Sequence, residues 1–124
     1  MTDQDIEKLI KEQNKYFDSE LTRSYESRLV SLKTLKRAIL SNEDELCRAL
    51  KEDLGKSRAE AFMCEIGLAI SEISWLIKNL RGLMGRRHIP TPLSQFAATS
   101  FRSPSPYGNV LIISPWNYPM LLTL

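Results

Sequence analysis

An apolar run meets a polar turn bracketed by two prolines in the stretch Val110-Leu111-Ile112-Ile113-Ser114-Pro115-Trp116-Asn117-Tyr118-Pro119. Four consecutive apolar residues, rich in β-branched side chains, predict a strand buried on both faces, as in a parallel sheet covered by helices. Each proline disfavours helical geometry in the residue before it, so the turn is expected to be stiff. Such a turn delivers the side-chain amide of Asn117 to the mouth of the strand, which is typical of an active site.

The predicted strand requires a sheet that the remaining sequence cannot supply. Parallel strands are joined by crossovers of about a dozen or more residues. Only eleven residues follow Ile113. We therefore expect this sequence to be a truncated piece of a larger protein.

The composition narrows the class of protein. The chain has 124 residues, 43% of them hydrophobic and 26% charged, as in an ordinary globular domain. Seventeen basic and fifteen acidic residues leave a net charge of +2, too balanced for a nucleic-acid or anionic-membrane partner. No apolar stretch is long enough for a secretory signal or a membrane span.

The cysteines and the histidine show no metal-ligand or redox spacing. Cys47 and Cys64 lie within helical periodicities, and His88 is the only histidine. We expect no metal site, and free thiols in a reducing, cytoplasmic environment.

The first 85 residues have apolar side chains at helical spacings of three and four. We expect four helices: one behind a Thr2 cap carrying Ile6 to Phe17, one over Leu21 to Ile39, a short one carrying Leu46 to Leu50, and a long one carrying Phe62 to Leu80. Asn42 with Glu45 and Ser57 with Glu60 resemble capping boxes, and Gly55 is a natural helix stop.

The remaining residues lose this periodicity. Residues 93–106 are expected to form an extended edge strand, and Tyr107-Gly108 a turn. The fold class is therefore mainly α, with four helices plus two strands, as a fragment of a parent α/β protein. We divide it into a helical segment (1–92), an extended linker (93–106), and the first strand and turn of an incomplete domain (107–124).

The segment from Ser103 to Pro119 resembles the first strand and oxyanion turn of the NAD(P)-dependent aldehyde dehydrogenases. The match is strong over about Phe101 to Leu122. Asp53-Leu54-Gly55-Lys56, followed by a long apolar helix, is similar to the short, typically dimeric branch that acts on fatty and aromatic aldehydes. Tyr118, where tetrameric members commonly have Phe, points to the same branch. The implied parent is an α/β enzyme with a Rossmann-like parallel sheet, and residues 107–124 would be the first strand and oxyanion turn of its dinucleotide-binding domain, which is incomplete in this sequence.

The resemblance assigns roles to residues of the turn. Asn117 would be catalytic, donating to the oxyanion of a cysteine thiohemiacetal. Cofactor-binding residues would be Ile113, Ser114, Pro115 and Trp116, and the substrate pocket would include Tyr118 and Leu122. From the residues alone, the simpler interpretation is that Asn117 is a turn or capping residue and that Trp116, Tyr118 and Leu122 are core residues. The match to the family's turn reverses this preference for Asn117.

The resemblance also implies what lies outside this sequence. Neither Cys47 nor Cys64 follows a strand, where a base and an oxyanion donor could converge, so both are interpreted as structural thiols. The nucleophile and base are expected beyond Leu124, and NAD or NADP is not expected to bind this piece tightly. We expect a homodimeric parent, and strand-mediated association of the piece. The alternative is a non-catalytic helical interaction module whose last strand pairs with a partner.

Overall fold

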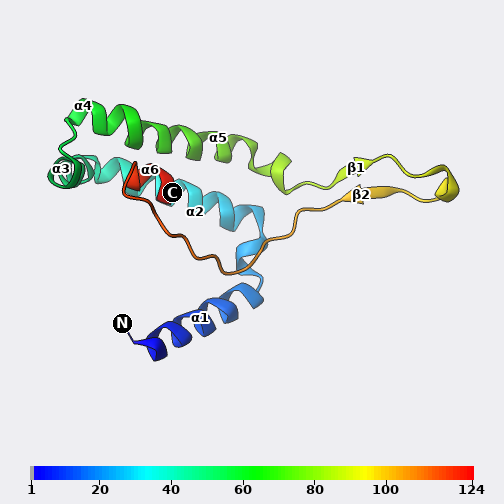
Figure 1. Cartoon of the computed structure of the whole chain (residues 1–124). Helices are drawn as coiled ribbons and strands as arrows, with labels where there is room; N and C mark the ends of the chain where they lie inside the picture. Colours follow the sequence, from blue (N-terminus) through cyan, green and yellow to red (C-terminus); the bar gives the residue numbers. More distant parts are fainter. Residues whose placement is uncertain (1) are drawn as a thin grey trace.

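The computed structural model describes residues 2–124 as a helical body from which a β-hairpin projects (Figure 1). The helices are α1 (Asp3–Asp18), α2 (Tyr25–Ser41), α3 (Glu43–Leu54), α4 (Arg58–Ala61), α5 (Gly67–Met84) and α6 (Pro119–Thr123). Shorter helical turns are the 3-10 segments η1 (Leu21–Arg23) and η3 (Leu93–Gln95) and the π-helix η2 (Phe62–Ile66). The strands are β1 (Arg87–Ile89) and β2 (Ser100–Arg102). The fold class is thus mainly helical with two strands, as predicted.

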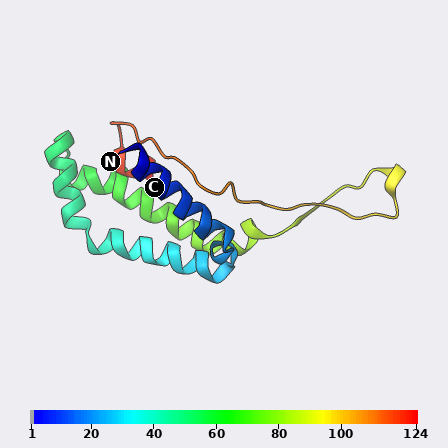
Figure 2. The ribbon, with the colours of Figure 1, turned by 90° about the horizontal axis from the view of Figure 1, so that it is seen from below.

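The core lies where α2, α3 and the long helical rod α4–η2–α5 meet. In Figure 1 α2 runs beside α5, with α3 at one end of the pair. The buried core side chains are Ile39, Cys47, Leu50, Ala61, Ile66 and Ile73. Helix α1 contributes no buried residue, and Figure 2 shows the hairpin extending away from this body. None of the helices described for residues 2–124 is long and apolar enough to cross a bilayer.

Most of the predicted helix boundaries are confirmed by capping geometry. Thr2 and Asp5 form a reciprocal capping box, and Ser57 accepts from the backbone N–H of Glu60. Gly55 ends α3 with a left-handed φ of 70°. The capping box predicted at Asn42 was wrong: its side chain donates back to the Ala38 carbonyl at 2.7 Å instead.

The second helix begins later than predicted. Its N-terminal residue is Tyr25, capped by Ser24, whereas Leu21 belongs to η1. Glu20 before that turn has a left-handed φ of 62°, so the backbone changes direction there and the helical period cannot continue from Leu21.

The two strands lie partly outside the predicted edge strand. β1 and β2 pair antiparallel, with His88 opposite Phe101. Residues 100–102 fall within the stretch predicted to be extended, but their partner β1 was not predicted. Residues 93–95 form a 3-10 turn between the strands instead of an extended edge.

The strand predicted at Val110 to Ile113 is absent, and the expected burial was wrong for this chain. These four residues have no strand assignment and are 59–84% exposed. A strand exists only with a ladder partner, and no third strand is present in residues 2–124. The predicted association through this segment stays a prediction. Gly108 has a positive φ of 92°, and the chain bends at the next residue, Asn109.

A π-turn interrupts the long helix at Phe62–Ile66. The N–H of Gly67 bonds to the carbonyl of Phe62, five residues earlier. A Cβ built on Gly67 would lie 2.9 Å from that carbonyl oxygen, closer than real side chains come. The wide turn therefore requires glycine at this position.

We predict opposite effects for alanine at two glycines of α5. Gly67→Ala should destabilise the chain by about 1–3 kcal/mol, because its Cβ meets backbone that cannot move freely. Gly82→Ala, where the added Cβ meets no atom within 4 Å beyond its chain neighbours and its own helix backbone, should stabilise it by up to about 1 kcal/mol through helix propensity. Urea unfolding of both variants measures this difference. Equal effects of the two substitutions would contradict the close packing at Gly67.

We also predict acid sensitivity at the start of α1. The backbone N–H of Thr2 donates to Asp5 Oδ2 at 2.7 Å, and this bond lowers the pKa of Asp5. A lowered folded-state pKa gives stability that is present above the unfolded value of about 3.9 and is lost as pH falls through the folded value. Amide protection in the first turn should therefore decrease below about pH 4, while Asp5→Asn should lack that protection at neutral pH. Asp3→Asn is the control and should resemble the wild type.

Candidate functional site

The proline-bracketed turn leads directly into the short helix α6, which packs against η2. Tyr118 is the N-cap residue of α6 and has a left-handed backbone, with φ 50° and ψ 52°. This conformation is uncommon for a residue with a side chain and costs roughly 1–3 kcal/mol. The turn is thus held in an unfavourable backbone conformation by its surroundings.

One set of hydrogen bonds closes the turn on itself. Ser114 Oγ donates to the carbonyl of Pro119 at 3.0 Å. The hydroxyl of Thr123 lies within hydrogen-bonding distance of the same carbonyl and of Ser114 Oγ. These bonds link both ends of the turn around Asn117.

A second set ties α6 to the helical body through Glu65. This carboxylate is fully buried in η2, and its Oε2 accepts from the backbone N–H of Met120 at 2.9 Å and of Leu121 at 3.3 Å. Its Oε1 accepts from the ammonium of Lys56, which is itself buried. In residues 2–124, no buried side-chain polar atom lacks a hydrogen-bond partner.

Lys56 connects this ion pair to the turn. Its Nζ lies 4.3 Å from the centroid of the Tyr118 ring, within the range of a cation–π contact. The hydrogen bond to Glu65 raises the pKa of Lys56, and burial opposes this less strongly. The ammonium therefore stays protonated through the neutral range.

Asn117 lies between these anchored residues, and its side chain is exposed. Within residues 2–124 its amide makes no hydrogen bond, and the first free amides of α6 are bonded by Glu65. The cap interpretation of Asn117 therefore finds no support here. An amide on a fixed turn with both N–H groups free can donate to a ligand.

The predicted cofactor-binding residues lie on an open surface next to α3. Ser114, Pro115 and Trp116 line a hollow of about 410 Å³ together with Asp53, Leu54 and Pro119. Ile113 is adjacent in sequence but does not line it. Trp116 is 94% exposed, so it is not a core residue of this chain. Cofactor binding by these residues stays a prediction.

The two predicted substrate-pocket residues differ in their surroundings. The ring of Tyr118 is 38% exposed and packs on Lys56, whereas Leu122 is 56% exposed. Neither of them lines the hollow that contains Trp116, and Asn117 does not line it either. Their contact with an aldehyde stays a prediction.

The cysteines lie within the helical body, as predicted. Cys47 is buried in the core, and Cys64 is half-buried in η2. Neither lines the hollow that contains Trp116.

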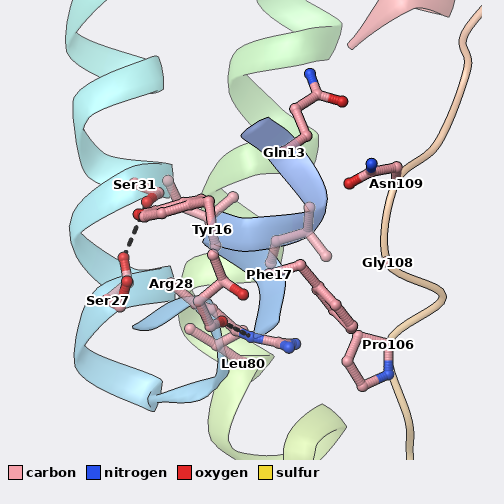
Figure 3. A pocket seen from close by; sticks show the side chains of 13 residues that line it. Gln13, Tyr16, Phe17, Ser27, Arg28, Ser31, Leu80, Pro106, Gly108 and Asn109 are labelled. Carbon is pink, nitrogen blue, oxygen red and sulfur yellow. Dashed lines mark hydrogen bonds between the residues drawn. The ribbon is translucent and has the colours of Figure 1, made fainter. Parts of the chain in front are cut away.

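A second hollow lies elsewhere and contains none of the predicted site residues. It measures about 600 Å³ and is bounded by α1, α2, α5 and the segment around Gly108 (Figure 3). Asn109 bridges to α1, donating to the Asn14 side chain at 3.0 Å and the Ile10 carbonyl at 3.3 Å. Arg28 is its only charged lining residue and donates to the Thr22 carbonyl.

The sequence analysis missed Lys56 and Glu65 as residues that shape the site. A signal for Glu65 was present: it lies four residues after Ala61 and four before Ala69, and both alanines are buried. A carboxylate at that spacing falls on the apolar stripe of the helix. A charge there requires a partner.

Comparison with known proteins identifies the family. The family model described as "Aldehyde dehydrogenase family" matches residues 1–124. A "4,4'-diaponeurosporen-aldehyde dehydrogenase" of Staphylococcus aureus is 37% identical over 117 residues, covering 94% of this chain and 26% of the relative. "Aldehyde dehydrogenase family 3 member H1" of Arabidopsis thaliana is 37% identical over 116 residues, covering 94% and 24%.

A solved structure agrees with these relatives. The structure described as "Substrate bound state of Staphylococcus Aureus AldH" superposes with a TM-score of 0.90 at 37% identity, covering 94% of this chain and 26% of that one. The chain therefore belongs to the aldehyde dehydrogenase family. It spans about a quarter of the length of the relatives it matches.

Proposed function

We propose that this chain is the N-terminal part of an enzyme that oxidises an aldehyde to a carboxylic acid with NAD or NADP. The single observation that carries the proposal is the free Asn117 amide on an anchored turn, in a chain that matches the family over its whole length. The nucleophilic cysteine and the general base would lie outside residues 1–124. The non-catalytic helical module is disfavoured, since the family match includes the turn as well as the helices.

The chemistry assigned to Asn117 is electrostatic. When a cysteine thiolate adds to the aldehyde carbonyl, the carbonyl π electrons move to oxygen, which becomes the negatively charged oxygen of a thiohemiacetal. The side-chain N–H of Asn117 donates to that oxygen. A donor that is already in place stabilises the charge without reorganising when the charge develops.

The residues before Asn117 would hold the cofactor. Ile113, Ser114, Pro115 and Trp116 offer backbone groups and an exposed indole, and the Ser114 hydroxyl is occupied within the turn. NAD or NADP, when bound, supplies the hydride acceptor of the reaction. Because the hollow is open to solvent in this chain, tight cofactor binding to these 124 residues alone is not expected.

The remaining parts of the proposal concern substrate and setting. Tyr118 and Leu122 would contact a fatty or aromatic aldehyde. A homodimeric parent and a cytoplasmic location are consistent with the branch that the sequence resembles and with two free cysteines.

We predict that the 124-residue chain alone does not reduce NAD or NADP in the presence of hexanal or benzaldehyde. Cys47 is buried in the core, and Cys64 is half-buried in η2 and does not line the hollow that contains Trp116. Cofactor absorbance measures the reaction. Activity that disappears in Cys47→Ser or Cys64→Ser would show that a cysteine of this chain is the nucleophile.

In the full-length enzyme, we predict that Asn117→Ala lowers single-turnover hydride transfer by about a hundredfold or more, the typical loss for one oxyanion donor. Cofactor affinity should be nearly unchanged. Asn109→Ala is a matched control, because it removes an amide from the same segment that bonds only α1 among the residues described here. If Asn117→Ala instead lowers only the melting temperature, Asn117 is a turn residue and not a donor.

A further inference from the structure

The first backbone N–H groups of helix α6 are bonded by a distant side chain and not by its N-cap residue. Helices normally satisfy these groups with the side chain of the N-cap residue. The N-cap residue here is Tyr118, which makes no side-chain cap. Glu65, 55 residues away in sequence, accepts from Met120 N–H at 2.9 Å and from Leu121 N–H at 3.3 Å.

The position of Glu65 depends on the π-turn. Residues 62–66 form one wide turn between α4 and α5, and π-turns of this kind often occur at functional sites. The turn persists because Gly67 leaves room for the Phe62 carbonyl. Glu65 is completely buried there and faces the start of α6.

Lys56 completes the arrangement from the other side. It follows Gly55, whose left-handed backbone ends α3. Its ammonium pairs with Glu65 and lies 4.3 Å from the centroid of the Tyr118 ring. One ion pair therefore contacts the side chain of residue 118 and the backbone of residues 120 and 121.

A stabilising role alone does not account for this pair. Burying an ammonium and a carboxylate costs free energy that their attraction often only balances, and apolar pairs of similar size are frequently as stable. What an apolar pair cannot do is accept two backbone N–H groups at a fixed place. The pair also faces the left-handed Tyr118, a conformation that needs external contacts to persist.

We propose that Glu65, charge-balanced by Lys56, is a positioning residue for Asn117: it fixes the start of α6, and thereby the turn that presents the Asn117 amide to the oxyanion. This inference rests on the proposed role of Asn117. Glu65 does not touch the substrate. It acts through the backbone that follows Asn117.

The first test measures the turn itself in the 124-residue chain. Hydrogen exchange by NMR should show Met120 and Leu121 amides protected in the wild type. Protection should fall about tenfold or more in Glu65→Gln and in the double variant Lys56→Met/Glu65→Leu. The double variant replaces both charges with apolar groups of similar size and leaves no unpaired buried charge. It should therefore stay folded even if Glu65→Gln unfolds the chain. Arg58→Gln is the control: it removes the ion pairs to Glu43 and Asp44 and leaves α6 untouched. Unchanged protection in the double variant would overturn the proposal.

The second test measures the chemical step in the full-length enzyme. Both variants should lower single-turnover hydride transfer by about tenfold to a hundredfold with little change in KM, while Arg58→Gln keeps the wild-type rate. A residue that acts through Asn117 loses its effect when Asn117 is absent. In the Asn117→Ala background, Glu65→Gln should therefore change the rate by less than about threefold.

The outcomes separate this inference from the proposed function. If Asn117→Ala leaves hydride transfer unchanged, the oxyanion role fails, and the positioning inference fails with it whatever the exchange data show. If Asn117→Ala slows the step but the double variant does not, only the positioning role of Glu65 is overturned. A full, additive loss from Glu65→Gln in the Asn117→Ala background would likewise overturn it, since Glu65 would then act elsewhere.

Discussion

The buried ion pair between Lys56 and Glu65 connects the helical body to the turn that follows the apolar run. The two carboxylate oxygens bond different groups, since one accepts from the ammonium and the other accepts from two backbone N–H groups of α6. An ionised carboxylate can satisfy all of these donors, and a neutral amide has only one acceptor oxygen. The need to bond an ammonium and a helix start together therefore favours glutamate at this position.

The backbone conformation around Lys56 and Glu65 explains how the two side chains meet beside the start of α6. Gly55 ends α3 and brings Lys56 inward, while the π-turn and Gly67 rotate Glu65 toward α6. Two local departures from regular helix thus converge on one ion pair. Because each depends on a glycine with a defined steric reason, the arrangement is specified by the sequence.

The parts of the fold that could be predicted are those governed by local rules. Helical spacing and the caps at Thr2 and Ser57 predicted the four main helices, and Gly55 correctly predicted the end of α3. The hairpin and the π-turn were missed, because pairing partners and an inserted residue leave no periodic signal. The apolar run at 110–113 was predicted to be a buried strand, but it is exposed in this chain. An apolar composition favours burial, but it does not show whether a neighbouring strand is present. The turn residues were found through family resemblance. The sequence carried a signal for a buried charge at Glu65, whereas its pairing with Lys56 and its bonds to α6 required the structure.

The contacts on either side of Asn117 show which part of the chain fixes its position. The apolar run before it is 59–84% exposed and has no ladder partner in the described chain, yet the turn after it is closed by Ser114 and bonded by Glu65. The turn therefore takes its shape without support from a sheet on the side of residues 110–113. The contacts that hold it come from the helical layer. If the proposed role of Asn117 is correct, the contacts from the helical layer to the turn set the direction of its amide.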